Sequence, residues 1–170
     1  MRLSHFPIGR RLAAVLSGLG LLMALLAAAA VVALRSLDEA VLGSDDAVER
    51  YALTVTMSEQ VHVVARVMRT VILLDDPALR EAEMAKITAA RQQYDEAWQA
   101  LQALPPSEDA RVLRSAVQAA ATPARAVNDR TLALARSDDD TQALALLMAE
   151  SIPAMQRWQD ALAANMAYLK

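Results

Sequence analysis

The chain contains no cysteine among its 170 residues. This absence excludes disulfide bonds, thiolate metal sites, c-type haem attachment and cysteine nucleophiles. Aromatic residues make up only 4% of the chain, and glycine and proline occur only 4 and 6 times. Strands collect aromatic and β-branched residues, and a many-stranded fold needs frequent turns, so these shortages exclude a β-sheet fold. The hydrophobic 55% is mainly alanine, leucine, valine and methionine, which favours an all-α fold.

Acidic residues are absent before Asp38, and the only charges before Arg35 are those of Arg2, Arg10 and Arg11. The 17 basic and 20 acidic residues are therefore segregated along the chain, and they form no basic footprint for nucleic acid. Between Arg11 and Arg35, residues 12–34 are uncharged, and they are apolar except for Ser17, Gly18 and Gly20. At about 1.5 Å per residue they reach roughly 34 Å, which is enough to span a bilayer core.

Positive charge marks the cytoplasmic side of a membrane segment. We therefore predict a cytoplasmic N-terminus at residues 1–11, a single transmembrane helix at 12–34 in a bacterial inner membrane, and a periplasmic domain at 35–170. The alternative is a cleaved signal peptide, with Ala28 and Ala30 as the small residues of its cleavage site. Both alternatives place the remaining residues outside the cytoplasm.

Beyond residue 35 the pattern is helical, with breaks at 75–77, 104–107 and 137–140. Proline at a first helical position, Ser107 as an N-cap and the aspartates after Ser137 each predict a helix start. Four helices with short connections pack antiparallel. The sequence predicts a transmembrane helix continuing into an up-down-up-down four-helix bundle.

The apolar spacing of the last three helices alternates steps of three and four, as bundle packing requires. In the first helix the register slips between Val55 and Val61, which predicts a stutter. Pro123 and Pro153 are expected to bend the third and fourth helices. The stripes predicted for the second, third and fourth helices are Ile87, Ala90, Tyr94, Ala97, Leu101 and Leu104; Leu113, Val117, Ala120, Ala124, Val127, Thr131 and Leu134; and Leu144, Met148, Ser151, Met155, Trp158, Leu162, Asn165 and Leu169.

Glu59 and His62 have the Glu-x-x-His spacing that di-iron bundles use. Such a site needs a second pair, and His5, the only other histidine, lies before the apolar segment. A haem held by His62 and a methionine is the other cofactor that these residues suggest, but methionines in apolar stripes more often fill cores. No catalytic triad or phosphate-binding glycine loop is visible. We expect no cofactor, no metal and no enzymatic activity.

His62, Arg66 and Arg69 share one side of the first helix. An arginine fork suits a carboxylate, so these residues are candidates for anion binding; a solvated flank paired with acidic residues is the alternative. Antiparallel packing is expected to bring Met148, Ser151 and Ile152 of the fourth helix beside Arg66. The apolar stripe of the first helix also exceeds what one internal seam uses, which predicts a homodimer. The residues of that stripe are Val61, Val64, Ala65, Met68 and Ile72.

The order of these parts resembles the N-terminal part of methyl-accepting chemotaxis proteins with a four-helix-bundle sensor domain. The resemblance rests on residues 8–12 opening the apolar segment, on 66–74 before Asp75-Asp76-Pro77, and on 132–138 before Gln142-Ala143-Leu144 and Ile152-Pro153. It covers the whole chain.

The resemblance implies a homodimeric periplasmic sensor for signal transduction and chemotaxis, with a small-molecule site between subunits. Arg66 and Arg69 match the arginines that hold a ligand carboxylate in amino-acid-sensing members. Receptors of this kind continue into a second membrane helix and a cytoplasmic signalling region, so a chain ending at Lys170 is expected to be truncated. The same domain also precedes histidine kinases and cyclases. A tethered or soluble periplasmic bundle acting as a chaperone, electron carrier or binding protein is the other alternative.

Overall fold

The computed structural model describes the backbone of residues 8–169 and the side chains of residues 46–169, together with those of 22, 23, 25, 26 and 29–31. All elements of this described backbone are helical, so the fold is all-α, as predicted. In chain order they are α1 (Ile8–Ile72), α2 (Pro77–Ala103), α3 (Glu108–Arg136), α4 (Asp140–Leu146), the π-turn η2 (Leu147–Ser151) and α5 (Ile152–Tyr168). The last three are continuous, and we call them together the fourth helix.

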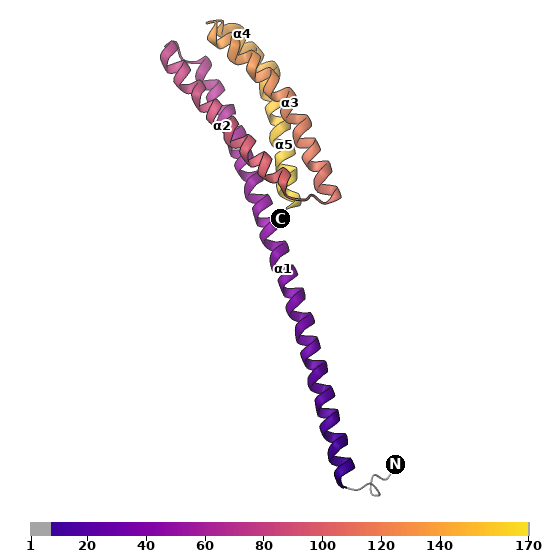
Figure 1. Ribbon diagram of the computed structural model, residues 1–170. Helices are drawn as coiled ribbons and strands as arrows, with labels where there is room; N and C mark the ends of the chain where they lie inside the picture. The colour runs from indigo at the N-terminus through magenta and orange to yellow at the C-terminus, as the bar shows by residue number, and fades with distance from the viewer. Residues whose placement is uncertain (1–7, 170) are drawn as a thin grey trace. The chain divides into compact units, whose positions relative to one another are not determined.

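The chain divides into two compact units, residues 1–45 and residues 46–170. In the second unit, the end of α1, α2, α3 and the fourth helix form a four-helix bundle (Figure 1). Short connections join consecutive helices, so neighbours in sequence run antiparallel.

The predicted transmembrane residues 12–34 lie within α1, but most of their side chains fall outside the described residues. Among the residues that are described, no helix has both the length and the apolar character needed to cross a membrane.

Local capping sets the helix starts at the three predicted breaks. Asp76 caps α2, with its Oδ1 accepting from the backbone N–H groups of Ala78 and Leu79 at 2.8 and 3.3 Å. Ser107 Oγ accepts from Ala110 N at 3.2 Å at the start of α3, and Asp139 caps α4. Each cap satisfies backbone donors that have no partner inside the helix.

The buried core follows the predicted stripe closely in α2, where the first five stripe residues, from Ile87 to Leu101, are buried. Tyr94 is the centre of a contact between three helices. Trp158 Nε1 donates to Tyr94 Oη at 3.1 Å, and the two rings meet edge to face at 4.9 Å. Arg125 lies over the Tyr94 ring at 5.0 Å and pairs through both terminal nitrogens with Asp95. This cluster joins α2, α3 and α5.

The stutter predicted in the first helix is wrong. Buried positions of α1 continue without a slip through the point of the predicted break, because Thr54 and Met57, not Val55, carry the stripe there. Thr54 is a polar residue and was therefore missed; its hydroxyl donates to Arg50 O at 2.8 Å and accepts from Asn165 Nδ2 at 3.3 Å. Internal hydrogen bonds make its burial acceptable.

The apolar residues that motivated a homodimer are all buried within one chain. Val61, Val64 and Met68 are 1%, 4% and 0% exposed, and Ala65 and Ile72 are each 8% exposed. The apolar surface of α1 therefore does not by itself require a second subunit.

The predicted register of the fourth helix is wrong at its beginning. Leu144 and Met148 are 48% and 62% exposed, whereas Ala143 and Leu147 are buried in their place. The π-turn causes this shift, because it inserts one extra residue before Ser151 and rotates everything upstream. From Ser151 to Asn165 the predicted stripe is buried as expected.

Pro153 explains the place of the π-turn. A proline inside a helix removes a backbone donor, and its ring collides with the carbonyl one turn earlier. Here the N–H of Ile152 bonds to Leu147 O, five residues back, so a wider turn immediately precedes the proline. Pro123 lies inside α3, which continues on both sides of it.

Candidate functional site

The outward face of α1 carries the residues that the sequence singled out. His62, Arg66 and Arg69 are all exposed and are spaced four and three residues apart on one side of the helix. Neither arginine side chain has a hydrogen bond or ion pair within the described part of the chain. No acidic residue in the described part of the chain pairs with these two side chains, so they are solvated and available to a ligand or a second subunit.

His62 contacts the fourth helix at the edge of this face. Its Nδ1 lies 3.0 Å from the amide nitrogen of Gln159. An amide nitrogen donates and does not accept, so His62 Nδ1 is the acceptor of this bond. His62 thus positions the α1 face against α5.

The predicted partner surface on the fourth helix is only partly available. Ser151 is fully buried, and its Oγ lies 2.9 Å from Thr131 Oγ1, so its side chain faces the bundle interior. Ile152 is half-buried and Met148 is exposed. The His62–Gln159 contact fixes the antiparallel level: one turn further along α1, Arg66 is level with about Met155. Ser151 and Ile152 are therefore level with Arg69 and not with Arg66.

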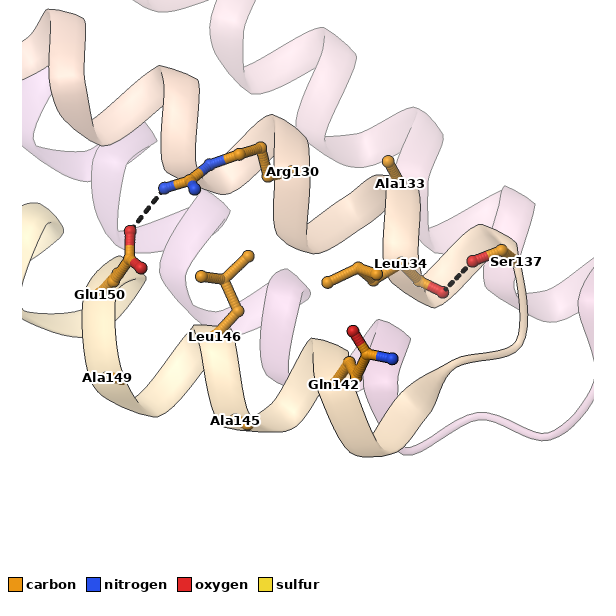
Figure 2. Close-up of a pocket in the computed structure, with 9 residues that line it drawn as sticks. All are labelled: Arg130, Ala133, Leu134, Ser137, Gln142, Ala145, Leu146, Ala149 and Glu150. Atoms are coloured by element: carbon orange, nitrogen blue, oxygen red, sulfur yellow. Dashed lines mark hydrogen bonds and ion pairs between the residues drawn. The ribbon is translucent and has the colours of Figure 1, made fainter.

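A second feature, which sequence reasoning missed, is an open groove between α3 and the start of the fourth helix. It measures about 750 Å³. Figure 2 shows Leu134 and Leu146 pointing into it, with the Arg130–Glu150 ion pair across one end. We call it the α3–α4 groove; its lining residues are Arg130, Ala133, Leu134, Ser137, Gln142, Ala145, Leu146, Ala149 and Glu150.

A buried arginine fixes the end of the bundle next to this groove. Arg80 is 4% exposed. Its Nε and Nη2 donate to Leu74 O at 3.1 and 2.6 Å, and its Nη1 donates to Ala135 O. It also pairs with Asp138 at 3.1 Å and Asp140 at 3.0 Å. One side chain thus joins the α1–α2 connection to the α3–α4 connection.

Two groups in the bundle have shifted pKa values. Burial raises the pKa of Tyr94 to about 12, outweighing the opposite effects of the Trp158 hydrogen bond and the Arg125 charge. Burial, and then the nearby charge of Arg50, lowers the pKa of Arg114, whose Nη1 donates to Leu104 O at 2.9 Å. Neither group lines the α1 face. Within the described residues, no three acidic or histidine side chains gather as a metal site would require.

Sequence reasoning did not identify the buried arginines or the α3–α4 groove. Arginine is usually exposed, so nothing in its local pattern distinguishes Arg80 from a solvated residue. The groove depends on the rotation of α4 produced by the π-turn. Pro153 is the available signal for this, but on sequence alone it predicts only a bend.

Comparison with known protein families identifies a sensory module. A family model described as a four-helix-bundle sensory module for signal transduction matches residues 5–170. Among solved structures, the chain is similar to a periplasmic sensor domain of a sensor histidine kinase, with 21% sequence identity and a TM-score of 0.66. The alignment covers 76% of this chain and 87% of that one, and at this identity it establishes a shared fold. No curated protein matches the chain.

Proposed function

The chain belongs to the family of four-helix-bundle sensory modules for signal transduction, and from this premise we propose that it is the ligand-sensing extracytoplasmic domain of a bacterial transmembrane chemoreceptor. The observation that carries the proposal is the α1 face, where Arg66 and Arg69 are exposed and have no partner in the described structure. A sensory module needs a surface that a ligand can complete, and this face has that property.

The chemistry of the face favours an anionic ligand, either a carboxylate or an amino acid. A guanidinium presents parallel donors that match the two oxygens of a carboxylate. The two arginines lie three residues apart, so both can contact one small molecule. His62 and the exposed surface near Ile152 border the same site.

A homodimer would place the α1 faces of two subunits together, with the ligand between them. Four arginines would then approach one another across the symmetry axis, and their repulsion disfavours the empty dimer. An anion between them offsets that repulsion. Ligand binding and dimer formation are therefore coupled, which provides a signal.

The same proposal places residues 1–11 in the cytoplasm, a membrane helix at 12–34 and the domain from residue 35 in the periplasm. Among the side chains described in this segment, the large apolar ones are exposed, from 49% at Val31 to 66% at Met23. A lipid environment would cover them favourably. The three arginines before residue 12 support the orientation.

A second candidate is the sensor domain of a histidine kinase. It is favoured by the similarity to the periplasmic sensor domain of such a kinase. Both candidates use the same ligand-binding domain and differ in the cytoplasmic output. Neither requires the domain itself to be an enzyme, so we propose that it has no catalytic activity.

Calorimetric titration with a panel of amino acids and carboxylates tests the proposal. A ligand of the wild-type chain should lose about 1.5 to 3 kcal/mol of binding free energy in either Arg66→Ala or Arg69→Ala, the scale of a charged hydrogen bond. Lysine at either position should not restore binding if the contact is bidentate. Arg111→Ala is the matched control, because Arg111 is an exposed arginine on α3 whose partner is Glu108 of its own helix. A ligand that binds both α1 variants with wild-type affinity contradicts the proposal.

A further inference from the structure

The α3–α4 groove continues along the outer seam of the bundle into a second hollow. This hollow measures about 430 Å³ and lies further along α3, beside Pro123 and Pro153. The two hollows share Arg130, Ala149 and Glu150 in their linings. The two hollows adjoin at the Arg130–Glu150 ion pair, between α3 and the fourth helix, and together we call them the outer trough.

Small side chains make the trough hollow. Ala133 on α3 and Ala145 and Ala149 on the fourth helix line the first hollow, and all three are exposed. The half-buried Leu134 and Leu146 form an apolar floor between them (Figure 2). This lining favours a ligand with a small apolar body.

The charges at the trough favour an anion. Arg130 is paired with Glu150, but the exposed Arg157, in the second hollow, has no hydrogen bond or ion pair within the described residues. The charges of Arg130, Glu150 and Arg157 sum to one positive charge. A carboxylate would satisfy the free guanidinium of Arg157 while its apolar body lies on the alanines of the same hollow, Ala126 and Ala149.

The walls of the trough depend on the π-turn. The sequence also fits a continuous α-helix in which Leu144 and Met148 face the core, since both follow the heptad spacing that ends at Ser151. In that continuous register, each residue before the turn lies where the preceding residue of the sequence lies in the present structure. Leu146 would then replace Ala145 and fill the first hollow with a bulky side chain, while Glu150, which lies inside the turn, would rotate toward the place of Ala149.

We propose that the outer trough binds a small organic carboxylate with an apolar body, and that it is open only while the fourth helix keeps its π-turn. The ligand then stabilises one of two helix registers, because it binds one and has no place in the other. Leu144 and Met148, now exposed, are the residues that the other register buries. This site is separate from the Arg66–Arg69 face and does not depend on it.

Binding of benzoate to the full chain tests the site, with benzamide as the uncharged control. Calorimetry should detect benzoate and not benzamide. Arg157→Ala should weaken benzoate binding about tenfold or more, and Ala149→Leu should abolish it by filling the trough. Both positions are exposed, so the fold should be kept. Arg66→Ala is the matched control and should bind benzoate as wild type does.

Three results would overturn the site. Benzoate that fails to bind, or that binds the Arg157→Ala and Ala149→Leu variants normally, removes the trough as a carboxylate site. If the Arg66→Ala variant loses benzoate binding while the Arg157→Ala variant keeps it, the ligand binds on the α1 face. That result supports the proposed function and contradicts this inference.

Thiol labelling tests the register, since the natural chain has no cysteine to interfere. Leu147→Cys is buried in the π-turn register and turns outward in the other one, so saturating benzoate should slow its labelling several-fold. Met148→Cys, exposed here, should label rapidly with and without benzoate. Labelling of Leu147→Cys that benzoate leaves unchanged contradicts the dependence on register.

Discussion

Arg80 is the residue whose loss should damage the bundle most at the connection end. Replacing it with alanine leaves Leu74 O and Ala135 O without their donor and separates the two connections. We expect Arg80→Ala to lower the free energy of unfolding by about 2 to 4 kcal/mol. Arg136→Ala removes only an exposed ion pair with Glu81 nearby and should cost less than about 1 kcal/mol. Chemical denaturation of both variants checks this, and equal small effects would show that Arg80 is not a structural link.

Tyr94 gives the molecule a pH dependence above pH 10. Its pKa is about 12 in the folded chain and 10.0 for an unperturbed tyrosine, so between these values the folded state binds more protons than the unfolded state. Stability contributed by the neutral phenol is complete below pH 10 and is lost as pH rises toward 12. The loss reaches about 2 to 3 kcal/mol.

The variant Tyr94→Phe isolates this effect from other groups that titrate in the same range. It should be less stable at neutral pH, because Trp158 Nε1 loses its acceptor, but its stability should fall less steeply above pH 10. Denaturation midpoints of both proteins across this range provide the measurement. Parallel curves would mean that Tyr94 ionises normally.

At the scale of the element, the sequence predicted what local chemistry determines. The three breaks were predicted because Asp76, Ser107 and Asp139 cap their own helices through nearby backbone donors. The α2 stripe was predicted because one uninterrupted α-helix has one periodicity. The start of the fourth helix was not, because its register depends on a π-turn that heptad spacing does not include.

The candidate site was likewise predicted only in part. Exposure of Arg66 and Arg69 follows from their place on the flank of the apolar stripe, and it was predicted. Burial of Ser151 was implied by its place in the stripe, yet it was also assigned to the ligand surface, and the structure separates these two roles. The buried Arg80 depends on carbonyls from two distant connections, which no local pattern contains.

Core truncations measure the register of the fourth helix directly. Leu147 is 3% exposed, so Leu147→Ala should cost about 2 to 4 kcal/mol of unfolding free energy. Met148→Ala removes a mostly exposed side chain and should cost less than about 1 kcal/mol. Thermal denaturation distinguishes the two, and the reverse order would show that the continuous α-helical register is the stable one.

At the scale of the whole molecule, the account predicts the topology of the chain in a bacterial membrane. A periplasmic reporter fused after Lys170 should be active, because three arginines precede the apolar segment and all acidic residues follow it. Activity only from a cytoplasmic reporter at the same junction contradicts this orientation. Recovery of a chain that begins near Val31 would instead favour the cleaved signal peptide.

The central claim is that an anionic ligand and a second subunit complete the α1 face. Sedimentation of the full chain in detergent, over a range of concentrations, tests it most directly when each run is repeated with the amino acid and carboxylate panel. Weak self-association that one compound strengthens is the predicted result, because a ligand that binds only the dimer shifts mass action toward it. The Arg66→Ala, Arg69→Ala double variant should lose that response. A chain that stays monomeric at every concentration with every compound contradicts the claim.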